Sequence, residues 1–431
     1  MVMRSTLRSV TRIGRTRETL VASMLYRRIR QVQRVLMAEG AGILLGRLVR
    51  RLTRRIESAA SPELPVRRSD VLAPDVERNA TPMTRVVSRD APLVVNWVLT
   101  PPSRGSGGHT TIFRLIHLLE QRGHQNRVYV YDRYLGDMEM HACMIRQLFP
   151  LVRAVIGDAT KGMAPCDAIF ATAWPTAYRV RNADVGGKRF YLVQDFEPYF
   201  YPAGTESVLA EATYRFGFRG VTIGRWLAHK LSDDYGMHCD HVEFGCDTGR
   251  YFMTNAGRRS GVAFYARPRV HRRGFQLGVL ALESFSKRHP DAEIHVFGDA
   301  VGKLPFPYTG HGVISPEELN ALYNRCAAGL SLSLTNISLI PLELLGAGCI
   351  PIVNDAPHNR STISNPYIRY APATPRSLAE AITEVIAAPN LVERAAEAAA
   401  SVRTATWEQA GETLERVLRL ELCSSPAYER S

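Results

Sequence analysis

The sequence of 431 residues has few cysteines and no pattern that would pair them. Its seven cysteines are scattered, and no two form a Cys-x-x-Cys pair. This spacing argues against a zinc ribbon and against the disulfide framework of a secreted domain, and it is typical of a protein from a reducing cytoplasm. With 45% hydrophobic and 22% charged residues, the composition is that of an ordinary globular protein, and the length suggests two or three domains.

The sequence also lacks the run of about 18 apolar residues that a membrane-spanning helix needs. The longest apolar stretch, 35–46, contains Glu39 and has arginine on both sides, so we expect no signal peptide. Residues 1–60 contain no lysine but fourteen arginines and three acidic residues, a net charge of +11, whereas the remainder has 40 basic and 38 acidic residues. An electrostatic partner would therefore meet this N-terminal extension.

Within the extension, residues 43–56 predict a helix with two different faces. At about 100° per residue, apolar side chains fall on one face and arginines on the other. The apolar set is Leu45, Leu48, Val49, Leu52 and Ile56, and the basic set is Arg47, Arg50, Arg51, Arg54 and Arg55. The pattern favours an anionic membrane surface, and the alternatives are packing on the protein itself or contact with nucleic acid. Nucleic acid is the least favoured partner because no aromatic residues interleave with the arginines. Since the membrane surface is favoured, we expect a cytoplasmic protein at the inner face of the plasma membrane.

After a Pro-, Ser- and Arg-rich linker at 61–92, apolar runs alternate with helical patterns. Strands are expected over 93–99, 127–131, 168–172, 190–193, 220–223, 262–265, 293–297, 329–334 and 350–353, and helices over 110–120, 207–216, 225–235, 274–288 and 341–347. This alternation predicts an α/β protein with two doubly wound, Rossmann-like domains at 93–256 and 257–405. The apolar stripe that begins at Trp407 predicts a final helix in 406–431. Ligands of such folds bind beyond the carboxyl ends of the strands, so we expect the site between the two domains.

The loop 101–109 (PPSRGSGGH) follows the first expected strand and opens the first helix. It has neither the GK[ST] of a Walker loop nor the GxGxxG fingerprint that a nicotinamide-dependent sugar epimerase would need. Gly107 and Gly108 allow the backbone to approach a ligand closely, and the helix N-terminus favours an anion. His109 is a candidate acid or base, with a helix cap as the alternative.

Two features of the second domain predict a site for a nucleotide. Four arginines follow its first strand, where cationic side chains suit a diphosphate, although a solvated basic loop is the alternative. These are Arg267, Arg269, Arg272 and Arg273. The segment 340–355 (IPLELLGAGCIPIVND) places Glu343 among leucines near a helix start, where a carboxylate needs a donor such as a ligand hydroxyl or the helix backbone.

The segment 194–201 (QDFEPYFY) places two acids beside a dense aromatic set, which suits a sugar acceptor or packing at the domain boundary. We assign Glu197 and Trp174 to acceptor binding. Asp195 and His109 are the candidates for removing the proton of the acceptor hydroxyl. No Asp-x-Asp motif occurs, so we expect neither a metal ion nor a cofactor.

Together these motifs resemble those of the GT-B glycosyltransferases. GGHTTIFRLIHLLEQRGH resembles their glycine loop and first helix, FGCDTGRYF resembles their entry into the second domain, and IPLELLGAGCIPIVND resembles their donor-site helix and the strand after it. The pair VNWVLTPPSRGSGGHTTIFR and YLVQDFEPYFYP is similar to bacterial rhamnosyltransferases that use dTDP-L-rhamnose to build surface glycans, such as the O-antigen and S-layer glycans. The resemblance runs from about residue 93 to the C-terminus and does not include the extension.

The resemblance implies roles for individual residues. Gly107 and Gly108 would face the cleft between the domains, Arg267 and Arg273 would hold the donor diphosphate, and Glu343 would bind the ribose of the nucleotide.

One position departs from the family pattern. Retaining enzymes of this kind often carry a second glutamate eight positions before the ribose-binding one, and Thr335 stands there in this sequence. Retention and inversion at the transferred sugar therefore both remain open.

We expect a glycosyltransferase that moves L-rhamnose from dTDP-L-rhamnose to a glycan or a lipid-linked glycan acceptor. A transferase for another UDP- or GDP-sugar is one alternative. A non-catalytic protein that binds glycan or nucleic acid is another.

Overall fold

The computed structural model describes residues 63–73 and 87–423. The helix expected over 43–56 lies outside these residues. None of the helices in the described ranges is long and apolar enough to span a membrane.

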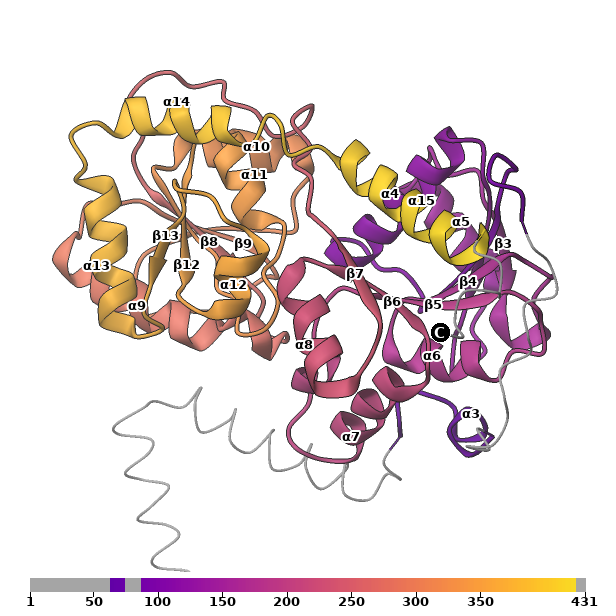
Figure 1. Cartoon of the computed structure of the whole chain (residues 1–431). Helices are drawn as coiled ribbons and strands as arrows, with labels where there is room; N and C mark the ends of the chain where they lie inside the picture. Colours follow the sequence, from indigo (N-terminus) through magenta and orange to yellow (C-terminus); the bar gives the residue numbers. More distant parts are fainter. Residues whose placement is uncertain (1–62, 74–86, 424–431) are drawn as a thin grey trace, which may run out of the picture. The chain divides into compact units, whose positions relative to one another are not determined.

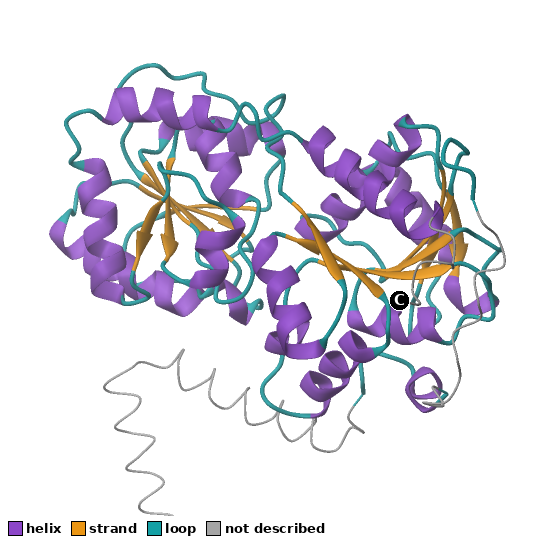
Figure 2. Cartoon of the chain, viewed as in Figure 1, coloured by secondary structure: helices purple, strands orange, loops and turns teal. Residues whose placement is uncertain are grey.

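The first domain is a seven-stranded, all-parallel sheet with helices on both of its faces (Figures 1 and 2). Its strand order is β3-β2-β1-β4-β5-β6-β7, so the chain starts in the middle of the sheet, builds one side and then the other. The strands are β1 (Val94–Leu99), β2 (Gln125–Val130), β3 (Val155–Asp158), β4 (Ala168–Ala171), β5 (Lys188–Val193), β6 (Arg219–Ile223) and β7 (Cys239–Val242). The helices are α4 (Gly107–Gln121), α5 (Met138–Leu148), α6 (Trp174–Arg181), α7 (Thr205–Ala212) and α8 (Arg225–Tyr235), with 3₁₀ turns η1 (Ala159–Lys161), η2 (Glu197–Phe200) and η3 (Thr213–Arg215).

The second domain repeats this plan with a six-stranded parallel sheet of order β10-β9-β8-β11-β12-β13. The strands are β8 (Val262–Ala266), β9 (Ile294–Gly298), β10 (Thr309–Gly312), β11 (Ala328–Leu330), β12 (Ile350–Asn354) and β13 (Arg369–Ala371). The helical elements are η4 (His271–Arg273), α9 (Phe275–Arg288), α10 (Pro316–Arg325), α11 (Ile340–Gly346), α12 (Pro357–Thr362), α13 (Pro375–Ile386) and α14 (Leu391–Ser401). Two parallel α/β domains are what the alternating pattern predicts, and this prediction is confirmed.

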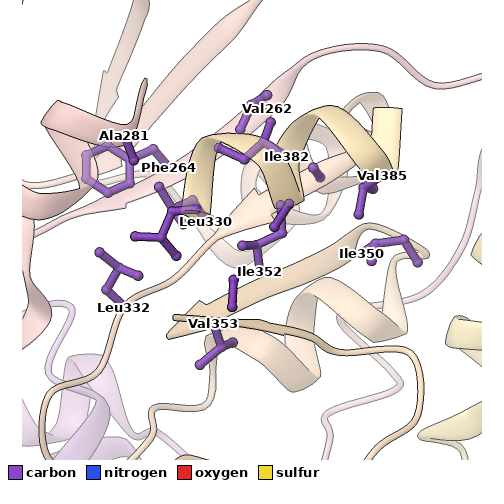
Figure 3. Close-up of a cluster of buried hydrophobic side chains, with 14 of the residues drawn as sticks. Val262, Phe264, Ala281, Leu330, Leu332, Ile350, Ile352, Val353, Ile382 and Val385 are labelled. Atoms are coloured by element: carbon purple, nitrogen blue, oxygen red, sulfur yellow. The ribbon is translucent and has the colours of Figure 1, made fainter. Parts of the chain in front are cut away.

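Each domain has its own apolar core. In the first, the rings of Trp97, Phe170 and Phe190 stack across three neighbouring strands, with centroids 4.3 and 4.9 Å apart. In the second, side chains of β8, β11 and β12 meet those of α9 and α13, as Figure 3 shows for Phe264 and Ile352. Central strands of a parallel sheet are buried on both faces, which explains their continuous apolar sequences.

The last helix, α15 (Trp407–Cys423), returns from the second domain and packs beside α4 of the first (Figure 1). Its buried stripe joins the core of the first domain, which is where the GT-B resemblance implies that the last helix packs. The stripe consists of Trp407, Ala410, Leu414, Val417, Leu418 and Leu422. This helix, which follows the second domain in the sequence, is therefore part of the first domain in space.

The observed elements differ from the expected ones in several places. Four strands that the sequence does not predict, β3, β7, β10 and β13, are the outer strands of the two sheets and lack long apolar runs. The expected strand 329–334 ends at Leu330, and the helix 207–216 gives way to η3 after Ala212. The linker 61–92 contains a short helix, α3 (Arg68–Leu72), whose Asp70 accepts a hydrogen bond of 2.6 Å from the Tyr131 hydroxyl.

Candidate active site

Two adjoining cavities lie where the carboxyl ends of the two sheets meet. The first has a volume of about 470 Å³ and the second of about 300 Å³, and side chains of both domains line each of them. Both cavities share part of their walls, formed by Ser103, Ser106, Gly107, Tyr265, Arg267, Ser338 and Leu339. One extended ligand could therefore occupy both, with its middle beside Gly107 and Arg267.

Glu343, in the first turn of α11, lines the first cavity. Burial raises the pKa of this carboxyl to about 7, and the nearby Asp247 adds to the shift, while Arg114 and the Tyr323 hydroxyl oppose it. That hydroxyl donates a hydrogen bond of 3.4 Å to Glu343 Oε2. Since this bond is long, the carboxylate is able to accept hydrogen bonds from the hydroxyls of a ligand.

Arg114 of α4 lines the same cavity and has no counterpart among the residues predicted from the sequence. Its guanidinium donates a 2.7 Å hydrogen bond to Asp247 Oδ2 and lies 4.7 Å from the centre of a Trp407 ring. The ion pair joins positions 133 residues apart, so no local sequence pattern could have revealed it.

Arg267 follows β8 and reaches the wall that the two cavities share. Its Nε lies 3.1 Å from Asp299 Oδ1, and one of its terminal nitrogens donates to the Tyr265 hydroxyl at 3.1 Å. Arg273 lines the second cavity and donates to Ser333 Oγ at 2.5 Å and to the Asn336 carbonyl at 3.2 Å. Both arginines that the resemblance implies for a diphosphate therefore face the cleft.

The glycine loop contributes the start of α4. Gly107 lines both cavities and Gly108 the second, and nothing lies within 4 Å of the Cβ that Gly107 lacks. The first N–H groups of a helix have no partner within the helix, so this terminus can receive an anion.

His109 belongs to the cap of the same helix. The Ser106 hydroxyl accepts from the His109 backbone N–H at 3.4 Å and pairs with the ring Nδ1 at 2.8 Å, while Nε2 pairs with the Thr100 carbonyl at 3.0 Å. Because a carbonyl only accepts, Nε2 carries the proton and Nδ1 accepts from the hydroxyl. Burial lowers the pKa of His109, and both of its ring nitrogens have partners.

Asp195 connects the two domains. Its Oδ1 accepts from the backbone N–H groups of Phe196 and Asn336, both at 2.9 Å. Its Oδ2 accepts from the Thr335 hydroxyl at 3.0 Å and from Arg272 Nε at 3.1 Å. Four donors therefore surround this carboxylate, and three of them belong to the second domain.

Glu197 lines the second cavity and is only 5% exposed. Its Oε2 accepts from the backbone N–H of Trp174 at 2.6 Å, and its Oε1 accepts from the Tyr191 hydroxyl at 2.9 Å. Burial raises the pKa of Glu197 to about 7, and the neighbouring Asp195 raises it further, against the effect of these two hydrogen bonds and of Arg272.

Trp174 does not line either cavity. Its side chain is 1% exposed, and its Nε1 donates to the Tyr201 hydroxyl at 3.1 Å. The ring therefore packs inside the domain rather than offering a face to a sugar, and the residue holds Glu197 through its backbone N–H. The sequence could not reveal this burial, because a single tryptophan at the start of a helix fits either environment.

Ser338 is a cleft residue that the sequence does not reveal. It lines both cavities, and its buried hydroxyl has no hydrogen-bond partner among the described residues. A buried hydroxyl normally has a partner, so this group can serve a bound ligand. In the part of the chain that the structure describes, no group of three His, Cys, Asp or Glu side chains is arranged to hold a metal ion.

The fold is shared with proteins of known structure. A glycosyltransferase from Rickettsia africae ESF-5 superposes with a TM-score of 0.57 at 12% identity, over 78% of this chain and 100% of that one. HepE from Anabaena, solved in complex with UDP-glucose, gives 0.57 at 12% identity over 77% of this chain and 100% of that one. With its two parallel-sheet domains on either side of a cleft, this chain has the GT-B fold of these structures.

The sequence comparisons identify the family. Residues 99–224 match the model described as "WsaF, N-terminal domain", and residues 260–383 match "WsaF, C-terminal domain". The two matches together span more than half of the chain, which therefore belongs to the family that this domain pair defines.

A curated relative matches more than half of the chain. The O-antigen biosynthesis protein RfbC of Myxococcus xanthus is 35% identical over 269 residues, or 59% of this chain. The match covers 21% of the relative, so this chain corresponds to about a fifth of that protein's length.

Proposed function

We propose that the protein transfers L-rhamnose from dTDP-L-rhamnose to a growing bacterial surface glycan. The observation that carries this proposal is the wall common to the two cavities, where Arg267 and the start of α4 at Gly107 lie together. A diphosphate at this point would extend its nucleoside toward Glu343 and its sugar toward the second cavity.

The charges of the cleft suit the departure of a nucleoside diphosphate. When the bond between the sugar and the diphosphate breaks, negative charge develops on the phosphate oxygens. Arg267, Arg273 and the N–H groups at the start of α4 would stabilise that charge with donors that are already in position. Arginines can supply this stabilisation directly, so the proposed reaction needs no metal ion.

The acceptor would enter the second cavity from the first domain. Glu197 and the neighbouring Gln194 offer oxygen acceptors there, and Phe200 offers an aromatic surface. A glycan acceptor is supported by the name of the RfbC relative, which is an O-antigen biosynthesis protein. A lipid-linked glycan is the form of acceptor that we propose.

The direct test is a donor panel. Purified protein would be incubated with a lipid-linked bacterial glycan and with dTDP-L-rhamnose, UDP-sugars or GDP-sugars in turn, and both the released nucleoside diphosphate and the extended glycan would be measured. We expect extension with dTDP-L-rhamnose and release that depends on the acceptor. Extension with a UDP- or GDP-sugar alone would replace the donor assignment. Binding without transfer from any donor would favour a non-catalytic glycan-binding protein.

We also propose that the Arg-rich extension holds the enzyme at an anionic membrane surface. Lipid-linked acceptors lie in the membrane, so attachment would raise the rate at which enzyme and acceptor meet. The division of residues 43–56 into an apolar and a basic face supports this role.

A further inference from the structure

The loop 132–137, between β2 and α5, presents apolar side chains to the solvent. Tyr134 is 68% exposed and Leu135 is 70% exposed, and Met140 in the first turn of α5 is exposed as well. Single exposed apolar side chains are ordinary on a protein surface, whereas a group of them marks a contact with a partner. Three large ones within seven residues of the chain form such a group.

Hydrogen bonds fix the conformation of this loop. Asp132 Oδ1 accepts from the Tyr134 N–H at 2.9 Å, and Oδ2 accepts from the Gly136 N–H at 3.1 Å and pairs with His141 Nε2 at 2.9 Å. Leu135 has a φ of +57°, and no other non-glycine residue in the described part of the chain has a positive φ. A leucine rarely adopts this conformation, and residues held in such conformations concentrate at functional sites.

The loop leaves the sheet at the edge that carries the cleft. Leu99 and Val130, the last residues of β1 and β2, are paired in the parallel sheet, so the loops that follow these strands start about 5 Å apart. The loop after β1 is the glycine loop 101–109, whose residues line both cavities. A surface that receives the loop 132–137 therefore lies next to the cleft.

The short helix α3 connects this loop to the Arg-rich extension. The backbone N–H of Arg67 donates to the Tyr131 hydroxyl at 2.9 Å, and its guanidinium donates to the Asp132 carbonyl at 3.0 Å. Arg67 stands eleven residues after Ile56, the last apolar residue of the basic amphipathic segment. An extended chain of that length spans at most about 40 Å, so the extension and the loop can contact one surface together.

The charges near the loop differ from those of the extension. Arg133 lies over the Tyr134 ring at 4.2 Å, while Asp137 and Glu139 are exposed at the start of α5. Because these acids offset the arginine, the loop offers apolar surface rather than positive charge, whereas the extension supplies five arginines in residues 43–56. A lipid bilayer presents anionic headgroups and an apolar interior side by side, and therefore suits both contributions.

We propose that Tyr134, Leu135 and Met140 insert into the boundary between the headgroups and the acyl chains of the bilayer that the extension binds. The inference rests on the proposed membrane role of the extension. The bound extension keeps the loop close to the bilayer, so that a weak second contact raises the affinity of the whole chain. Stable attachment takes two such signals, and the loop alone is too small to provide it. In this orientation the glycine loop faces the membrane surface, where a lipid-linked acceptor lies.

The test compares Leu135→Asn with Leu151→Asn in the full chain. Asn tolerates a positive φ, so Leu135→Asn should fold and melt as the wild type does. Leu151 is 65% exposed and stands shortly before β3, at the amino end of the sheet, so the same change there is the matched control. We expect Leu135→Asn to bind phosphatidylglycerol vesicles about tenfold more weakly than the wild type, by the same factor at low and high salt. Leu151→Asn should bind as the wild type does.

A second measurement locates the contact. In the full chain, Tyr134→Trp adds an indole to the loop, and its fluorescence should shift to the blue and be quenched by vesicles of brominated phosphatidylglycerol, after subtraction of the wild-type signal. Leu151→Trp should show neither effect.

Three outcomes would contradict the inference. If Leu135→Asn binds vesicles as the wild type does, or if Tyr134→Trp is not quenched, the loop does not insert, although the extension can still bind. If Leu135→Asn instead changes the sedimentation of the protein alone and leaves vesicle binding unchanged, a second copy of the chain covers the loop. If the full wild-type chain binds no vesicles, the proposed membrane role of the extension fails together with the inference.

Discussion

At the scale of single residues, the cleft contains arginines that can bind a negatively charged ligand, and it contains Glu343, whose own charge depends on pH. Arg267 is the cation that both cavities share. Its replacement should therefore weaken the binding of any ligand that carries a diphosphate. A hydrogen bond to a charged group contributes about 1.5–3 kcal/mol. Arg267→Ala should therefore weaken binding of dTDP-L-rhamnose by about 10- to 150-fold, as measured by calorimetry.

The matched control for Arg267 is two residues away. Arg269 is exposed and lines neither cavity, so Arg269→Ala should bind the donor as the wild type does. Equal losses in both variants would show that only the general positive charge of the loop matters. Unchanged affinity in Arg267→Ala would remove this residue from the donor site.

Glu343 should make stability depend on pH. Its folded pKa of about 7 lies above its ordinary value of 4.5, so the folded state binds the proton more tightly than the unfolded state. The contribution of this group to stability is therefore complete below about pH 4.5 and is lost as the pH rises to about 7.

The variant Glu343→Gln cannot ionise and should flatten that part of the profile. We expect its melting temperature to rise relative to that of the wild type as the pH increases from 5 to 8, as measured by differential scanning fluorimetry. Glu393→Gln, an exposed position on α14, should leave the profile unchanged. A parallel profile for Glu343→Gln and the wild type would contradict the assigned pKa.

Single residues were predictable from the sequence where a motif fixed their place. Gly107, Arg267 and Glu343 lie at the ends of strands or the starts of helices, and the order of strands brings such positions to one edge of a sheet. Arg114 and Ser338 were not predictable, because only the tertiary structure brings them to the cleft. Burial removes the Trp174 ring from both cavities, whereas Asp195 lines the second cavity and accepts four hydrogen bonds there.

At the scale of elements, α15 packs on the first domain although the whole second domain lies between the two in the sequence. Gly411 lies against α4 so closely that an added Cβ would be 3.0 Å from Leu118 Cβ. On the same helix, ion pairs join Glu421 to Lys188 at 3.1 Å and Glu415 to Arg122 at 3.2 Å. The helix is thus fixed by close packing on one side and by charge at its edges.

Leu414→Ala should destabilise the first domain. Leu414 is completely buried in the core of that domain, and removing a buried leucine side chain costs roughly 2–5 kcal/mol. The exposed Leu420 on the same helix is the control, since surface changes usually stay within about 0.5 kcal/mol.

Tryptophan fluorescence during urea unfolding would measure this difference. Trp97, Trp174, Trp226 and Trp407 all lie in the first domain or on α15, so the signal reports on the domain in question. We expect a lower midpoint for Leu414→Ala and an unchanged one for Leu420→Ala. A shared midpoint for all three proteins would show that α15 does not stabilise the domain.

The strands show the limit of sequence patterns at this scale. Central strands such as β4 and β5 are buried along nearly their whole length, and their apolar residues predict them. An outer strand needs no such sequence, because one of its edges has no neighbouring strand and its faces are less covered. β3 has no fully buried residue and β10 is the Gly-rich TGHG, so backbone pairing rather than apolar patterning defines both.

At the scale of the whole molecule, the two domains are joined by polar contacts near the second cavity. Asn336 of the second domain donates from its side chain to the Gln194 and Ile223 carbonyls of the first, both at 2.9 Å. Gly224, the residue after Ile223, has a φ of +83°. A Cβ on this residue would lie 2.5 Å from Cγ2 of Thr362 in the second domain. Because side chains rarely adopt this φ, the close approach of the two domains at Gly224 depends on glycine.

The Arg-rich extension gives the last prediction. Basic residues near an anionic bilayer contribute about 1 kcal/mol each, so the five arginines of residues 43–56 suffice for reversible attachment. Full-length protein should co-sediment with vesicles that contain phosphatidylglycerol, and a shortened chain that begins at Glu63, which keeps α3, should not. Binding should weaken as salt is added, because salt screens the charges and leaves only the apolar component.

Two variants of the full chain separate the faces of that expected helix. Replacing its five arginines by Gln should reduce binding to anionic vesicles by more than about tenfold, since several contributions of about 1 kcal/mol are lost together. Leu48→Glu with Leu52→Glu should also reduce it, and the remaining binding should then be abolished by salt. Equal sedimentation of the full and shortened chains would exclude a membrane role for the extension. Tighter, salt-sensitive binding to nucleic acid than to vesicles would assign its arginines to that partner instead.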